Sequence, residues 1–228
     1  MMFGTTVFED RRQAGQALAE ALAEFELHDP VILALPRGGV PVGFELAEQL
    51  GAPLDVLVVR KLGVPGHEEL AMGAIASGGA RVLNPDVVAS LRISDPVIEQ
   101  VAAREQRELE RRERLFRGER EPVSVEGRTV ILVDDGLATG ASMRAAVLSL
   151  RERNPREIIV AVPVGAASSC AQLRRLADRL VCLAEPEPFY GVGLWYRVFD
   201  QTSDEEVRRL LEANPSPQSP AQAGHSEA

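Results

Sequence analysis

Val130-Ile-Leu-Val-Asp-Asp-Gly-Leu-Ala-Thr-Gly-Ala-Ser142 combines three features that together predict how this chain folds. Its first four residues are all apolar, which is typical of a strand buried on both faces of a parallel sheet. Two adjacent carboxylates, Asp134 and Asp135, follow the strand directly, and the Thr139–Ser142 turn then opens a helix. A strand, a polar turn and a helix in this order predict an open α/β sheet, in which ligands bind at the carboxyl ends of the strands.

The turn and the carboxylates indicate binding sites for two chemically different parts of one ligand. The turn offers backbone N–H groups at a helix N-terminus, which is a ready phosphate site, and Gly140 lets the backbone approach the oxygens closely. Carboxylates repel phosphate and instead suit sugar hydroxyls or a metal ion. A Walker A loop is excluded, because Ala141 follows Gly140 where a lysine is required. We therefore favour a sugar-phosphate site over an ordinary strand end with an Asp cap.

The rest of the chain alternates strand-like and helix-like segments, which predicts a central, mostly parallel sheet flanked by helices. The predicted strands cover 31–35, 54–59, 129–133, 157–164 and 179–183. The predicted helices cover 10–25, 41–50, 95–116, 140–153, 167–177 and 204–213. Between them we expect a mobile loop over Leu62–Glu69 and a small hairpin formed by 71–76 and 81–83.

One predicted helix is unusually charged. Residues 96–121 hold seven Glu and seven Arg, and the apolar stripe is thin. We favour a solvated helix that leans on the core with that one stripe, formed by Ile98, Val101, Leu109, Leu115 and Phe116. A dimer arm, or part of a hood over the site, is the alternative.

Composition excludes several classes of protein. The 228 residues fit one domain of 1–213 followed by a polar tail, 214–228, that we expect to be disordered. A net charge of −9 and an aromatic share of 4% disfavour binding to nucleic acid. The chain lacks a long apolar run and a signal-like N-terminus, so we expect no membrane contact and a cytoplasmic protein. Only Cys170 and Cys182 are present, which disfavours a disulfide framework or a thiolate zinc site and indicates packing residues.

Two further segments carry basic residues directly after predicted strands. Pro36-Arg-Gly-Gly39 follows the first predicted strand, so that Gly38 and Gly39 can expose N–H groups while Arg37 adds a guanidinium fork. Arg60 and Lys61 follow the second predicted strand, and Lys61 is the only lysine of the chain. A compact ammonium is a point charge that suits phosphate oxygens.

The acidic doublet followed by Thr-Gly resembles the signature of the type I phosphoribosyltransferases, which use phosphoribosyl pyrophosphate (PRPP). The Phe8-Glu-Asp-Arg-Arg-Gln-Ala-Gly15 segment and the Gln201-Thr-Ser-Asp-Glu-Glu-Val207 segment are similar to a less characterised bacterial branch of that family. The resemblance covers about residues 3–212. It implies a type I three-layer α/β fold with a small hood and an inserted charged helix. We expect the N-terminus and residues of about 184–200 to form the hood, with 95–117 as an optional further part.

The resemblance also implies roles for named residues. Asp134 and Asp135 would hold the ribose hydroxyls. The 5′-phosphate would bind to Ala138, Thr139, Gly140, Ala141 and Ser142. Pyrophosphate would bind to Arg37, Gly38, Gly39, Arg60 and Lys61. The catalytic group would comprise Asp134, Asp135, Lys61 and Arg37. Mg²⁺ would be held mainly by the substrate, with Asp134 and Asp135 as additional ligands.

Acceptor recognition depends on the late loop, which covers about residues 184–200. An aromatic residue that stacks on a base is expected there, with Phe189, Tyr190 and Trp195 as candidates, although these residues can equally pack the hood or a subunit contact. Ala138 stands where 6-oxopurine enzymes carry their proposed general base, so an acceptor of that kind is in doubt.

The sequence therefore predicts a transferase that moves 5-phosphoribosyl from PRPP to a nitrogen acceptor, taken to be a nucleobase, and releases pyrophosphate. The expected partners are PRPP, a small-molecule acceptor and optionally a second copy of the chain. A regulatory module that senses PRPP or a nucleotide without catalysis is the main alternative, because this fold is also used in regulators. A phosphoribosyl hydrolase or phosphatase-like activity is a third. All three require the carboxylate pair to face the mouth of the sheet; an ion pair that buries both side chains would contradict them.

Overall fold

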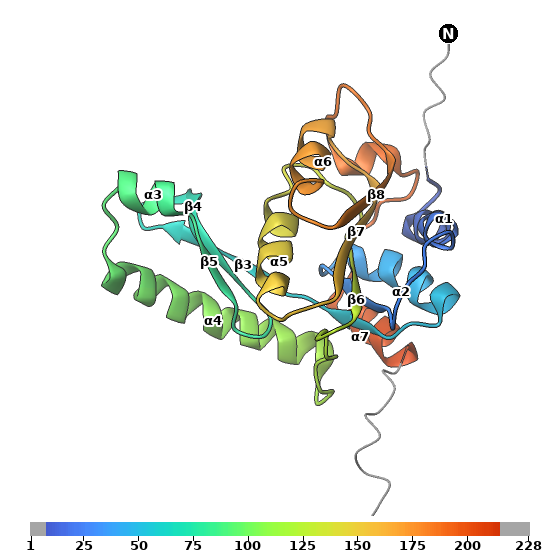
Figure 1. Cartoon of the computed structure of the whole chain (residues 1–228), viewed down its shortest axis with the longest axis horizontal. Helices are drawn as coiled ribbons and strands as arrows, with labels where there is room; N and C mark the ends of the chain where they lie inside the picture. The colour runs from blue at the N-terminus through green and yellow to red at the C-terminus, as the bar shows by residue number, and fades with distance from the viewer. Residues whose placement is uncertain (1–7, 215–228) are drawn as a thin grey trace, which may run out of the picture.

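A computed structural model describes residues 8–214 as a three-layer α/β core with a long projecting wing (Figure 1). The core holds a five-stranded parallel sheet in the order β2-β1-β6-β7-β8. Its strands are β1 (Val31–Ala34), β2 (Leu54–Val56), β6 (Thr129–Val133), β7 (Glu157–Val164) and β8 (Arg179–Ala184). The mostly parallel α/β sheet predicted from the sequence is confirmed.

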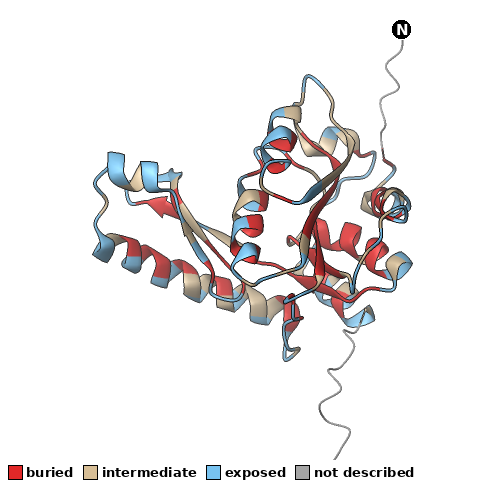
Figure 2. Ribbon diagram, in the orientation of Figure 1, coloured by how far each residue is buried: buried red, intermediate tan, exposed pale blue. Residues whose placement is uncertain are grey.

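Helices cover both faces of this sheet because its central strands are apolar on both sides. Ile32, Ile131 and Ile159 pack on one face with α1 (Arg11–Leu22), α2 (Gly39–Leu50) and α7 (Asp204–Ala213). Leu33, Leu132 and Val160 pack on the other face with α5 (Ala141–Arg151) and α6 (Ala167–Leu173). This alternation along each strand makes two core layers, and the buried strands between them are red in Figure 2.

The wing is a second, antiparallel sheet in the order β3-β4-β5. It consists of β3 (Val59–Val64), β4 (His67–Ala76) and β5 (Arg81–Leu83), with α3 (Pro85–Ser90) at its tip and α4 (Asp95–Arg117) along one face. The predicted 71–76/81–83 hairpin is confirmed as β4 and β5. The predicted loop over Leu62–Glu69 is wrong: most of it lies in β3 and β4, and only a short turn, at Pro65 and Gly66, separates the strands.

The predicted second strand, 54–59, is also wrong in its extent. It divides after Val56, because Val58 and Ser77 exchange hydrogen bonds at the entrance to the wing. Val59 then pairs with Ala76 in the second sheet. The basic pair Arg60–Lys61 therefore belongs to the wing and not to the end of a central strand.

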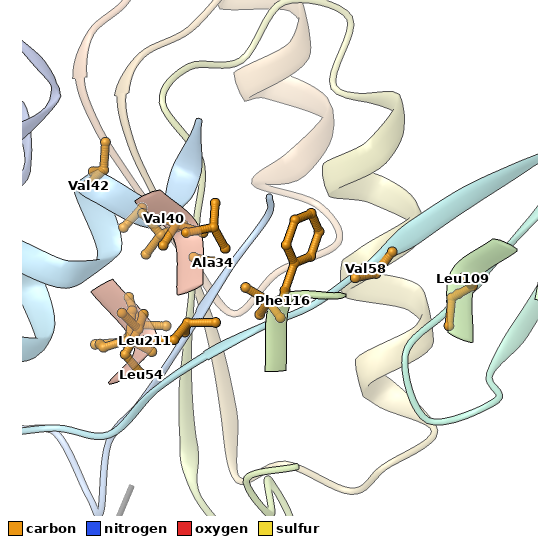
Figure 3. Packing of buried hydrophobic residues seen from close by; sticks show 14 of the residues in the cluster. Ala34, Val40, Val42, Leu54, Val58, Leu109, Phe116 and Leu211 are labelled. Carbon is orange, nitrogen blue, oxygen red and sulfur yellow. The ribbon is translucent and has the colours of Figure 1, made fainter. Parts of the chain in front are cut away.

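The charged helix α4 buries only its narrow apolar stripe and exposes its other sides (Figure 2). The favoured prediction placed this stripe against the core, whereas the helix lies mainly along the wing. Its main contacts are with β3 and α7. Figure 3 shows Phe116 between residues of the core, such as Ala34 and Leu54, and residues of the wing, such as Val58 and Leu109. All of them belong to one hydrophobic cluster, so the wing and the core share their packing.

A buried ion pair joins the end of α4 to the edge strand of the core. Arg117 Nε lies 2.9 Å from Asp55 Oδ1, and the two side chains are only 8% and 6% exposed. Arg117 Nη2 also donates to the Val56 carbonyl at 3.1 Å, and Asp55 Oδ2 accepts from the Val123 N–H at 3.1 Å. Each member of this ion pair therefore has a further hydrogen-bond partner within the protein.

We predict that Arg117→Met strongly destabilises the protein, because Asp55 would then be a buried charge without its partner. Breaking a buried pair in this way costs about 3–5 kcal/mol, which lowers Tm by roughly 6–20 °C in a chain of this size. Thermal unfolding measures the effect. The control is Arg111→Met, whose side chain is 60% exposed on the same helix; equal Tm values for the two variants would contradict the prediction.

Candidate functional site

The two adjacent carboxylates lie at the carboxyl end of β6, between β1 and β7, where the sequence predicted a ligand site. Asp134 Oδ1 accepts a hydrogen bond from the Asp135 N–H at 2.9 Å. Asp135 Oδ2 accepts from Arg11 Nε at 2.9 Å and lies 2.8 Å from Arg11 Nη2. Each carboxylate thus commits one oxygen to the protein.

The other two oxygens, Asp134 Oδ2 and Asp135 Oδ1, receive no hydrogen bond or ion pair from another described residue. Within residues 8–214, Trp195 Nε1 is the only side-chain nitrogen or oxygen that is both fully buried and without a partner. The two carboxylate oxygens therefore keep contact with solvent. An ion pair that buries both carboxylates would have contradicted the site. The observed ion pair involves only Asp135, through one of its two oxygens.

Burial raises the pKa of both carboxyl groups. The pKa of Asp134 is raised well above its usual range, first by desolvation and then by the charge of Asp135. The pKa of Asp135 is also raised by desolvation, while the Arg11 guanidinium opposes that shift. The two groups are best described as a pair of like charges for which the protein supplies one nearby cation.

The Pro36–Gly39 loop packs directly on this pair. A Cβ atom at Gly38 would lie 2.0 Å from Asp135 Oδ2, and one at Gly39 would lie 2.7 Å from the Val133 carbonyl. Both glycines are therefore required by close approach, a role that the sequence analysis missed. Gly39 donates its N–H to the Leu35 carbonyl at 3.0 Å, so this group does not point at a ligand. Arg37 makes only a 3.4 Å contact with Asp204, and its side chain is 37% exposed.

The 138–142 segment forms the predicted turn at the start of α5. Gly140 adopts φ 70°, a left-handed conformation that favours glycine. No hydrogen bond to another described residue uses the N–H groups of Thr139, Gly140 or Ser142. Ser169 Oγ donates to the Ala138 carbonyl at 2.6 Å and Arg144 Nη1 donates to the Thr139 carbonyl at 2.7 Å, so other residues hold the turn through its carbonyls. The Ala141 N–H donates to Thr139 Oγ1 at 3.4 Å, and the other three N–H groups stay available.

Comparison with known proteins agrees with this geometry. A model of the phosphoribosyl transferase domain matches residues 9–192. This chain belongs to the phosphoribosyl transferase family. Two Mycobacterium tuberculosis proteins that are provisionally named phosphoribosyl transferases are 47% identical to it over 206 residues, or 90% of the chain. The chain spans about half, 46%, of the length of each of these relatives.

A solved structure shows the same fold. The protein TT1426 from Thermus thermophilus superposes with a TM-score of 0.82 at 45% identity, over 91% of this chain and 99% of that one. This solved protein therefore shares the three-layer architecture of the chain, in which helices cover a central parallel sheet. The described part of the chain contains no helix that is long and apolar enough to cross a membrane.

The structure does not bring the family's predicted basic pair to the acidic doublet. Arg60 Nη2 lies 2.6 Å from Glu105 Oε2 on α4, and Lys61 Nζ lies 3.3 Å from Glu69 Oε2 on β4. Neither side chain makes a hydrogen bond or ion pair with Asp134, Asp135 or the 138–142 turn. The pyrophosphate role of Arg60 and Lys61 stays a prediction.

The predicted aromatic candidates divide into two groups. Phe189 and Trp195 pack with Phe8 and Val164. The Val164 carbonyl accepts from the N–H of Leu137, two residues after the doublet. Tyr190 is 81% exposed. The aromatic residue that does reach the acidic doublet is Tyr196, whose hydroxyl donates to the Asp135 carbonyl at 2.5 Å. Burial and the Asp135 charge raise the pKa of Tyr196, so its hydroxyl remains a donor.

Arg11 is the residue that sequence reasoning missed. It opens α1, where Asp10 caps the helix by accepting from the Gln13 N–H. An arginine in a first helical turn has no periodicity that marks it as functional. The only signal was its presence in the Phe8–Gly15 segment that carried the family resemblance.

The two cysteines are 12 residues apart in the chain but lie next to each other in the structure. Cys170 Sγ and Cys182 Sγ lie 3.7 Å apart, and Cys170 is fully buried. A carboxylate oxygen of Glu185 lies within 4.8 Å of both sulfurs, but Arg174 binds this carboxylate. The packing role predicted for Cys170 fits its place in the core beside Leu173.

We predict that Asp134→Asn stabilises the protein at neutral pH. The folded state raises the pKa of this carboxyl, so wild-type stability falls as pH rises above the unfolded value of about 3.9. The amide removes that loss and keeps an oxygen for the Asp135 N–H. Tm should rise by a few degrees at pH 7, and the gain should vanish towards pH 4. A gain that persists unchanged at pH 4 would contradict the prediction; exposed Glu126→Gln is the control.

Proposed function

We propose that this chain transfers the 5-phosphoribosyl group of PRPP to a nitrogen acceptor, taken to be a nucleobase, and releases pyrophosphate. One observation carries the proposal: adjacent Asp134 and Asp135 each keep one oxygen free, next to a turn with free N–H groups. Two neighbouring acceptors suit a vicinal diol, and the N–H groups at the start of α5 suit a phosphate.

In this proposal each part of the substrate has its own residues. Asp134 and Asp135 accept hydrogen bonds from the ribose hydroxyls, and the 138–142 turn holds the 5′-phosphate. Cleavage at the anomeric carbon develops positive charge on the ribose, as in other reactions with an oxocarbenium-like transition state. The nearby carboxylates stabilise that charge, and their stabilisation is greatest in the transition state.

The leaving group is assigned to the Pro36–Gly39 loop. Arg37 is weakly held by Asp204 and so is free to reorient towards pyrophosphate. The free oxygens of Asp134 and Asp135 are hard ligands of the kind that Mg²⁺ accepts beside substrate phosphates. When bound with PRPP, Mg²⁺ would supply positive charge that offsets the charge of the leaving pyrophosphate.

The homodimer expected from the sequence also remains a prediction, which a sizing column can test.

A second candidate function is a sensor that binds PRPP without catalysis. The positions of Arg60 and Lys61 favour it, because these two cations contact α4 and β4 and not the acidic doublet. A site that binds ribose and phosphate but lacks a full set of leaving-group cations would bind its ligand without accelerating the reaction.

We expect pyrophosphate release when the protein is incubated with PRPP, Mg²⁺ and a panel of nucleobases. Asp134→Asn should lower turnover by roughly 10²–10³-fold, as is typical when a charge-stabilising group is removed. Its predicted gain in stability means that this loss would not arise from unfolding. PRPP binding in a calorimeter without release for any base would favour the sensor. Release without any added base would favour a hydrolase, and absence of both binding and release would overturn the proposal.

A further inference from the structure

Arg11 contacts both the acidic doublet and the late loop. Nε and Nη2 approach Asp135 Oδ2 at 2.9 and 2.8 Å, and the Arg11 and Asp135 side chains are 12% and 15% exposed. Nη1 donates to the Asp200 carbonyl at 2.7 Å. The guanidinium also lies 4.0 Å from the centre of the Phe199 ring, at cation–π distance.

The pattern of these contacts fixes the rotation of the Asp135 carboxylate. Both guanidinium nitrogens approach the same oxygen, Oδ2, and leave Oδ1 unbonded. Gly38 lies against that same Oδ2, with space too small for a Cβ atom. One oxygen is therefore enclosed by protein on two sides, and the carboxylate can only present the other to a ligand.

The same contacts attach the late loop to the doublet. Tyr196 donates to the Asp135 carbonyl at 2.5 Å, while Arg11 binds Asp200 and stacks on Phe199. Backbone bonds of 2.9 Å join Phe8 to Trp195 and Arg197. The start of α1 and the late loop thus form one unit, and Asp135 is one of the residues through which this unit contacts the central sheet.

We propose that Arg11 is a positioning residue for ribose recognition, which holds Asp135 by one oxygen so that the other faces the sugar hydroxyls. This inference rests on the proposed PRPP site and adds to it a residue outside the predicted motifs. Arg11 does not block the site, because a blocking guanidinium would occupy both oxygens or the one that faces solvent.

The inference predicts a specific defect in variants of Arg11. Ribose 5-phosphate and tetrahydrofurfuryl phosphate both offer a five-membered ring and a phosphate, but only ribose 5-phosphate offers hydroxyls. Wild-type protein should bind ribose 5-phosphate more tightly. Arg11→Gln should reduce this preference by roughly tenfold or more, the value of a hydrogen bond to a charged group, and change binding of the hydroxyl-free ligand little.

Calorimetry on the full chain measures both affinities. Arg11→Lys should retain part of the preference, because it keeps the charge but loses the fork. The matched control is Arg12→Gln, since Arg12 is the next residue of α1, is 71% exposed and pairs with Glu45 instead. This control should leave the preference unchanged.

Each outcome has a distinct meaning. If Arg11→Gln weakens both ligands equally, Arg11 serves only to hold the fold and the inference is overturned, as it is if neither affinity changes. If wild-type protein binds neither ligand, the proposed PRPP site fails first and the inference falls with it. Arg11→Lys provides the comparison if Arg11→Gln does not fold, and full wild-type preference in Arg11→Lys would also overturn the inference.

Discussion

Two like charges at the end of one buried strand are the constraint around which the site is arranged. Asp134 and Asp135 are adjacent in sequence, and burial raises the pKa of each. Keeping both carboxylates there costs free energy unless cations and N–H groups are close. Arg11 supplies the cation, and the Asp135 N–H supplies a hydrogen bond to Asp134. A bound substrate would supply the remaining donors through its hydroxyls, so the ligand-free site is less stable than a filled one.

The same constraint accounts for residues that look unrelated in the sequence. Gly38 and Gly39 have no side chains because the doublet lies against their backbone. Gly136 follows the doublet, and a Cβ atom there would lie 2.4 Å from Val192 Cγ1 of the late loop. These glycines, in the Pro36–Gly39 loop and directly after the doublet, thus let two loops approach the carboxylate segment closely. Pro36–Gly39 and 192–200 are separated by more than 150 residues but meet at this point.

Short sequence patterns predicted the elements whose conformation depends on residues that are neighbours in the chain. The apolar run Val130–Val133 and the Thr139–Ser142 turn were predicted as a buried strand and the opening of a helix on either side of the acidic doublet, and the structure has them in that order. The phosphate role of the turn stays a prediction. The sequence could not locate Arg11, because its role depends on contacts with Asp135 and Asp200, which are distant in the chain. The Leu62–Glu69 error has a local cause: Gly63, Pro65 and Gly66 indicated a loop, but pairing with β4 overrode these residues. Only one short turn remained.

The wing limits how the basic pair can take part in chemistry. Arg60 binds Glu105, whose side chain is 10% exposed, and β3 packs on α4, which is anchored to the core through Phe116 and Arg117. Releasing Arg60 alone would leave Glu105 a poorly solvated charge with only exposed Arg104 beside it, which is costly. Lys61 is different, because it lies on the other side of β3, is 44% exposed and is held only by fully exposed Glu69. If one of the two residues contacts pyrophosphate, the energetics favour Lys61, and Arg60 serves to hold the strand that carries it.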